Sequence, residues 1–292
     1  MKPACILFLT LAASLTLRAD FSYTTTVKSP GGAMAAATPG SNRVTKTYLK
    51  GQKMTIDRGS SVTIFDFDAQ TSTYIDSSQK TYRVSKFSDM SEALGKSRQD
   101  LNIEVKDTGQ KKTINGYNAS EMVISAELDN PSGRQAGMKM HMEVDFWISS
   151  DVPGAQELRA FYQRNAAKFP WGAMAGDGGR GNPSMRNAMV ELLRKMSDMK
   201  GVPVLEVLKV GGGNDAQQAQ MQQGMAQARA QLEEMKRQGK LTPQMEEALK
   251  RMNAGSSDGS MFETTMESSD FSASPIPESV FAIPAGYQQT QQ

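Results

Sequence analysis

The stretch "MKMHMEVDFW", residues 138–147, decides the fold, because it reads either as a strand or as a metal site. Side chains alternate between the two faces of a strand. Six apolar residues of this parity share one face: Met138, Met140, Met142, Val144, Phe146 and Ile148. The other face carries Lys139, His141, Glu143 and Asp145, with Trp147 as the exception. This pattern predicts a strand with one buried face.

The competing interpretation is a copper site, since thioether and imidazole groups are both copper ligands. Such a site needs His141 and the methionines to converge, whereas a regular strand points them to opposite faces. We therefore expect a salt-bridged or solvated surface histidine, and no metal or other cofactor.

Further strands extend outward from this one. Residues 20–85 contain short Thr- and Tyr-rich runs separated by Gly, Asp and Ser, which predict antiparallel hairpins. Asn115-Gly116 is the strongest hairpin dipeptide. Residues after Pro153 change to helical periodicity, in an apolar stripe with one polar member, Asn165. Residues 214–253 predict a Gln- and Met-rich helical hairpin, with Gly239 ending its first helix and Thr242-Pro243 beginning its second.

The chain begins with a predicted signal peptide, residues 1–19, in which Lys2 precedes a short apolar run. Its removal takes away Cys5, the only cysteine, and leaves residues 20–292 as a single domain. It also removes Lys2 and Arg18 from 33 basic residues, leaving 31 against 31 acidic ones. A net charge near zero argues against nucleic-acid binding. We expect a periplasmic or secreted chain with no transmembrane span once the signal peptide is cleaved.

The residues used in catalysis are sparse. One histidine and no mature cysteine disfavour Ser-His-Asp, Cys-His and multi-ligand zinc sites. Asp66, Asp68 and Asp76 resemble a calcium loop only loosely and are expected to cap turns instead. We therefore expect a protein that is not an enzyme, although a hydrolase using two carboxylates stays open as a further alternative.

Four segments carry a family resemblance. They are "YLKGQKMTIDRGSSVTIFDFDAQTSTYIDSSQKTYRV" (48–84), "TGQKKTINGYNASEMVIS" (108–125), "DFWISSDVPGAQEL" (145–158) and "IPESVFAIPAGYQ" (276–288). They resemble a bacterial exported family called domain of unknown function 4412, within which residues 214–253 look like an insertion. The resemblance implies an α+β fold similar to the lipoprotein carriers LolA and LolB: a curved antiparallel half-barrel with helices covering its concave face. It brings no established activity.

Two functions follow as hypotheses. The first is a binding or carrier protein for a lipid, acyl chain or lipoprotein, held on an apolar concave face. The residues expected to line that face are Ile56, Tyr82, Val84, Met140, Met142, Val144 and Phe146. The alternative within this hypothesis is that helices simply fill the face. The second function is an envelope protein-interaction or structural module that uses the hairpin at 214–253. The sequence leaves the oligomeric state open.

Overall fold

The computed structural model describes residues 20–31, 43–89, 103–129, 139–165, 188, 191, 195, 199–212, 215–242, 245, 246, 249 and 262–290. The strands are β1 (Phe21–Gly31), β2 (Arg43–Lys50), β3 (Lys53–Asp57), β4 (Ser61–Asp66), β5 (Thr71–Asp76), β6 (Thr81–Lys86), β7 (Ile103–Ile114), β8 (Tyr117–Asp129), β9 (Lys139–Ser149), β10 (Val202–Gly212), β11 (Phe262–Ser272) and β12 (Gln288–Gln289). The helical elements are α2 (Ala155–Asn165), α5 (Asp215–Arg237) and the 3₁₀ turn η3 (Glu278–Phe281).

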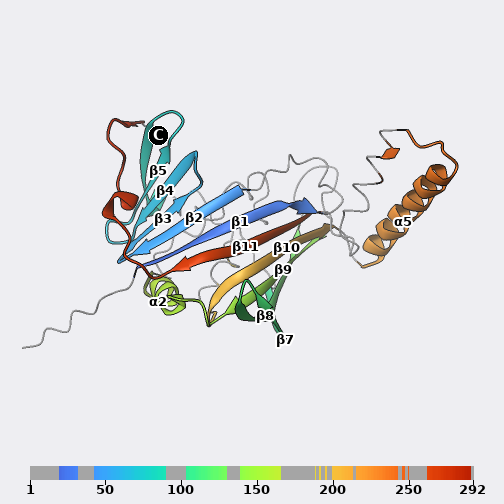
Figure 1. The fold of residues 1–292 in the computed structure, drawn as a ribbon, viewed down its shortest axis with the longest axis horizontal. Coiled ribbons are helices and arrows are strands. Elements are labelled where there is room, and N and C mark those ends of the chain that lie inside the picture. Colours follow the sequence, from blue (N-terminus) through green and yellow to red (C-terminus); the bar gives the residue numbers. More distant parts are fainter. Residues whose placement is uncertain are drawn as a thin grey trace, which may run out of the picture.

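The described strands form one open sheet in the order β12-β6-β5-β4-β3-β2-β1-β11-β10-β9-β8-β7. Two antiparallel meanders, β1 to β6 and β7 to β11, meet where β1 pairs with β11, and Figure 1 shows these two strands at the middle of the sheet. β12 adds to the β6 edge in the parallel direction, so the sheet is mixed. The two halves are therefore held together by strands near the two ends of the described chain, β1 and β11.

Turn residues behave as their chemistry predicts. Asn115 and Gly116, between β7 and β8, both have positive φ, +50° and +84°, as a tight hairpin turn requires. The Oδ1 atoms of Asp66 and Asp76 accept backbone N–H bonds from the residues that follow them. The prediction that these two aspartates cap turns is confirmed.

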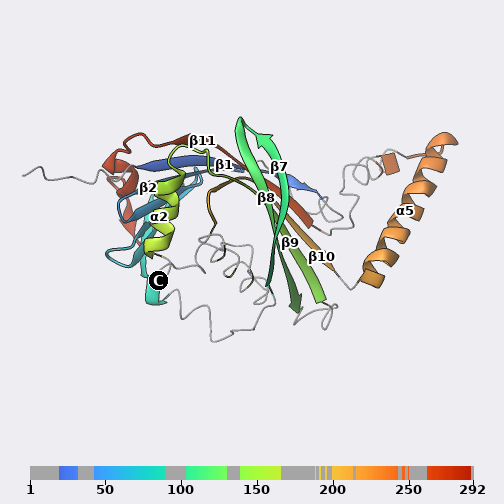
Figure 2. The same ribbon diagram turned by 90° about the horizontal axis from the view of Figure 1, so that it is seen from below.

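The tip of the β7–β8 hairpin covers Trp147, the apolar exception on the polar face of β9. A register shift between Asp107 and Lys111 bends β7, as bulges do. The Lys112 ammonium then lies 3.7 Å from the Trp147 ring, and Trp147 is only 7% exposed. Figure 2 shows this hairpin standing across β9 and β10. Trp147 can therefore be apolar on an otherwise polar face because the β7–β8 hairpin buries it.

The opposite face of the sheet, called here the inner face, carries the main core. Under α2 it includes Phe21 of β1, Met54 of β3 and Phe65 of β4, packed with Phe161 of the helix. Asn165, the polar member of the α2 stripe, is buried, and its amide both donates to and accepts from the Gln52 amide. Because its polar atoms are bonded, its burial costs little.

The β9 end of the inner face is filled. Met142, Val144 and Phe146 are at most 1% exposed, and they pack in clusters that include Ala188 and Met199. The strand parity predicted from residues 138–148 is confirmed for its described part, whereas Met138 lies outside the described residues. Here the alternative that other parts of the chain fill the face is the better description.

The predicted α+β half-barrel with a helix-covered concave face is wrong. The described structure is a twelve-stranded open mixed sheet, and α2 is the one described helix of two turns or more that packs on it. α5 lies beyond the end of β10, apart from the sheet, in both views (Figures 1 and 2). Its described side chains are mostly exposed, since a Gln-rich helix with a narrow apolar seam has little to bury.

The end of α5 and the start of the next helical segment agree with the prediction for residues 214–253. Gly239 has a φ of +66°, and the Lys240 N–H donates to the Met235 carbonyl while the Gly239 N–H donates to the Lys236 carbonyl. These two bonds form a Schellman motif. The Thr242 hydroxyl accepts from the Met245 N–H at 3.3 Å, as an N-cap does.

Gly154, just before α2, packs closely against Phe21 of β1. Its φ is +80°, and a Cβ added there would lie 2.5 Å from Cδ2 of Phe21. Gly59 has the same φ of +80° but open space around it. We expect Gly154→Ala to lower the free energy of unfolding by about 1–3 kcal/mol more than Gly59→Ala, because only the former forces Phe21 to move. Urea unfolding of both variants measures the difference, and equal losses would show that Phe21 does not pack against this turn.

Candidate functional site

Five of the seven residues predicted to line the apolar face share the inner face. Met140, Met142, Val144 and Phe146 alternate along β9 toward it. Ile56 reaches the same face through cross-strand pairing with Thr47, which opposes Tyr23. Ile56 and all of these except Met140 are less than 9% exposed, so they form core rather than an open surface.

Tyr82 and Val84 lie on the opposite face. Pairing runs from Ile56 to Thr63, Tyr74 and Arg83, so Arg83 is the β6 residue that shares a face with Ile56. Val84 is 37% exposed, and the Tyr82 hydroxyl bonds to Gln289 of β12 at 3.4 Å. The structure therefore does not bring these two residues to the predicted site.

A partly exposed region remains between the two filled ends of the inner face, and we call it the central patch. Its residues are Tyr23, Thr25 and Val27 of β1, Glu206 and Leu208 of β10, and Met266 of β11. Val27, Met266 and Glu206 are successive cross-strand partners in one row. The flanking Phe21 and Phe146 are fully buried. The central patch is thus a part of the inner face where apolar side chains keep some contact with solvent.

Glu206 is the unusual member of this patch. Its cross-strand partners are the apolar residues Phe146 and Met266. Among the described residues, no hydrogen bond or ion pair reaches its carboxyl. Although part of the side chain is exposed, the surrounding protein disfavours the charged form, and this burial raises the pKa of Glu206 to about 7. A carboxyl of this kind is half ionised near neutral pH.

Two tyrosines lie close enough to Glu206 to feel its charge. Burial raises the pKa of Tyr23 to about 12, a hydrogen bond with Thr47 lowers it, and the Glu206 charge raises it further. Burial likewise raises the pKa of Tyr162, on α2, well above its usual value, with the charges of Tyr23 and Glu206 adding to the effect. Both tyrosines therefore stay protonated and offer neutral hydroxyl groups. Three elements, β1, α2 and β10, thus bring one carboxyl and two phenols together.

The sequence analysis missed this group, although one signal was present. In "VPVLEVLKV", residues 202–210, Val202, Val204, Leu208 and Val210 share a parity with Glu206. A single acid among four apolar residues of one parity marks a carboxyl placed in a buried row. The two tyrosines gave no such signal, because their approach depends on the β1–β11 register.

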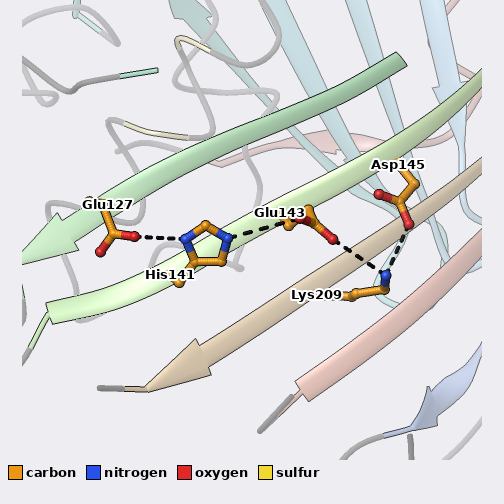
Figure 3. A network of polar contacts seen from close by, with 5 residues as sticks. All are labelled: Glu127, His141, Glu143, Asp145 and Lys209. Carbon is orange, nitrogen blue, oxygen red and sulfur yellow. Dashed lines mark hydrogen bonds and ion pairs between the residues drawn. The ribbon is translucent and has the colours of Figure 1, made fainter. Parts of the chain in front are cut away.

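The outer face of the same strands is polar and internally paired. His141 Nδ1 lies 2.7 Å from Glu127 Oε1, and Lys209 Nζ lies 3.0 Å from Asp145 Oδ2 and 3.4 Å from Glu143 Oε1 (Figure 3). Burial lowers the pKa of Lys209, but the hydrogen bond to Asp145 and the charges of both acids raise it by more. The prediction that His141 lies on the surface, on the polar face of β9, is confirmed, and its ring bonds to the Glu127 carboxylate.

Neither face offers a metal site within the part of the chain that the structure describes, where no three His, Cys, Asp or Glu side chains gather to hold an ion. None of the helices in the described ranges is long and apolar enough to cross a membrane.

The carboxyl of Glu206 predicts a pH dependence of stability. In the unfolded chain this group ionises near pH 4.5, whereas in the folded protein it holds its proton up to about pH 7. The folded state binds more protons between these values, so the stability that this carboxyl contributes is fully present below pH 4.5 and is lost as the pH rises through 7. We expect Glu206→Gln to remove about 2–3 kcal/mol of the difference in unfolding free energy between pH 5 and pH 8.

Denaturant unfolding at both pH values measures this change, with Glu143→Gln on the outer face as the matched control. Wild-type and Glu206→Gln proteins with the same pH dependence would contradict the burial of this carboxyl.

Comparison with known proteins gives a family but no function. The family model described as "Domain of unknown function (DUF4412)" matches residues 30–192, more than half of the chain. A search of curated proteins found no match. Two structures of PNGF-II, in C2 and P21 space groups, are similar with TM-scores of 0.34 and 0.33 and sequence identities of 10% and 8%. They cover 94% of this chain, but the chain spans only 31% and 32% of theirs.

Proposed function

This chain belongs to the DUF4412 family, and we propose that it is a non-enzymatic binding or carrier protein for a small hydrophobic ligand. The ligand lies on the central patch, with its apolar part against Val27, Leu208 and Met266. We further propose that the chain works outside the cytoplasm, in the periplasm or after secretion, once residues 1–19 are removed.

The observation that carries this proposal is the partial exposure of an apolar row between two filled ends of the sheet. Phe146 on one side of the row is fully buried, while Leu208 and Met266, on the next two strands, keep part of their surface in water. A ligand that covers apolar surface left in water on this face gains about 25 cal/mol per Å² from its burial. Binding sites are commonly apolar with a few polar groups, as here with Tyr23 and Glu206.

The chemistry of the patch favours binding over catalysis. General acid–base hydrolysis by paired carboxylates needs two acids that face the same substrate. On the inner face, Glu206 stands between Phe146 and Met266, whereas Glu143 and Asp145 project from the outer face. A lone carboxyl beside two phenols is suited to recognising a polar group at the end of an apolar ligand.

Calorimetric titration with 1-octanol tests the binding proposal on the exported chain. The intact mass of that chain should correspond to a protein that begins at Asp20. We expect octanol to bind the wild type, and Met266→Trp to weaken binding at least about tenfold by filling the space beside Glu206. Thr265→Trp, one residue away on the outer face, should bind like the wild type. Equal weakening by both variants, or no binding by the wild type, would refute a ligand site on the central patch.

A second candidate function is protein interaction through α5. The described side chains of α5 around Gln227 and Gln231 are exposed, while Leu232 and Met235 are partly buried, and the helix projects away from the sheet (Figures 1 and 2). We propose that the seam containing these two apolar residues contacts an envelope protein, since adaptable Met-rich surfaces suit such contacts.

A pull-down from envelope extract with the double variant Leu232→Glu and Met235→Glu tests this second function. Its matched control, Gln227→Glu and Gln231→Glu, adds the same charge elsewhere on α5. Loss of a specific partner only with the seam variant is the expected result, and an unchanged set of partners would exclude this role for the seam.

A further inference from the structure

The acidic side chains on the two faces differ in whether a hydrogen-bond or ion-pair partner balances their charge. On the outer face, Glu267 accepts from the Asn115 amide at 2.8 Å and pairs with Lys28, Asp145 pairs with Lys209, and Glu127 bonds to His141. The hydrogen bonds from Lys28 and Asn115 lower the pKa of Glu267. Glu206, on the inner face, has no such partner among the described residues. A carboxyl in apolar surroundings without a partner is costly to keep, and a ligand of opposite charge would offset that cost.

The described groups that face Glu206 are neutral or distant. Tyr23 lies two strands away on β1 and Tyr162 lies on α2, and both phenols keep their protons at neutral pH. Arg43 occupies the same row as Glu206 but three strands away, about 14 Å between backbones at ordinary strand spacing, and it is exposed. Among the described residues, no charged group therefore balances the Glu206 carboxylate.

We propose that Glu206 is the head-group site for an amine-bearing amphiphile, a primary ammonium attached to an apolar chain; this rests on the proposed ligand site of the central patch. The ammonium donates to the Glu206 carboxylate. The apolar chain lies along Val27 and Met266 in the same row.

Charge decides between this ligand and its analogues of equal length. An ammonium forms a charge-assisted hydrogen bond with the carboxylate, which is about twice as strong as a neutral one. An alcohol makes only the neutral bond, and an anionic head meets like charge in a region of low polarity. The site therefore selects the cation, and the selection grows as the pH rises and Glu206 ionises.

Calorimetric titrations with n-octylammonium, 1-octanol and octanoate, at pH 5.5 and pH 8, test the assignment on the full exported chain. An alkylammonium stays charged throughout this range, so only the protein titrates. At pH 8 we expect octylammonium to bind at least about tenfold more tightly than octanol, and octanoate to bind most weakly. At pH 5.5 the preference for the ammonium should shrink to less than about threefold.

The variants separate the head-group site from the apolar site. Glu206→Gln, nearly the same shape, should abolish the preference for octylammonium over octanol at pH 8, whereas Glu143→Gln should preserve it. Equal binding of octylammonium and octanol in the wild type at pH 8 would overturn the head-group assignment but leave the proposed function standing. Failure of all three ligands to bind would overturn both.

Discussion

The pairing of β1 with β11 is the interaction on which the rest of the structure depends. It joins two antiparallel meanders through residues more than 230 positions apart, such as Thr25 and Ser268, whose hydroxyls lie 3.3 Å from each other. Such distant pairing is slow to form, because a long loop must close before the contacts stabilise it. Once formed, it turns two sheets into one with a continuous inner face.

The same pairing creates the proposed site. Tyr23 belongs to the first meander and Glu206 to the second, so their approach exists only because β11 connects β1 to β10. Phe271, at the irregular end of β11, adds ring contacts with Phe21 and Tyr23, at 6.4 and 6.0 Å between centroids. A functional site at the junction of two independently formed halves depends on the whole chain, rather than on one motif.

Much of the local structure could be predicted from the sequence, because hairpin and strand signals are local. The Asn115-Gly116 turn, the parity of β9 and the end of α5 at Gly239 follow from residue chemistry within a few positions. Long-range register is not local, so the face of Tyr82 and Val84 was assigned wrongly. The burial of Trp147 depends on a bulge that bends β7, which the alternation of residues does not reveal.

The helix-covered half-barrel failed for a related reason. Apolar stripes in the Met-rich segments indicate helices but not what those helices cover, and a weak seam such as that of α5 does not require the sheet. Glu206 shows the opposite case. Its position in an apolar row is visible in the sequence, but its place between Phe146 and Met266 becomes visible only when β9 and β11 are placed beside it.

The central claim is that Glu206 is a carboxyl held in the inner face with no ion-pair partner among the described residues, and its ionisation can be measured directly. The ¹³C chemical shift of its side-chain carboxyl, identified by its absence in Glu206→Gln, reports ionisation as the pH is changed. The structure predicts a midpoint near pH 7, raised by burial. A midpoint near the ordinary value of 4.5 would place this carboxyl in water or beside an unrecognised cation, and would contradict the account.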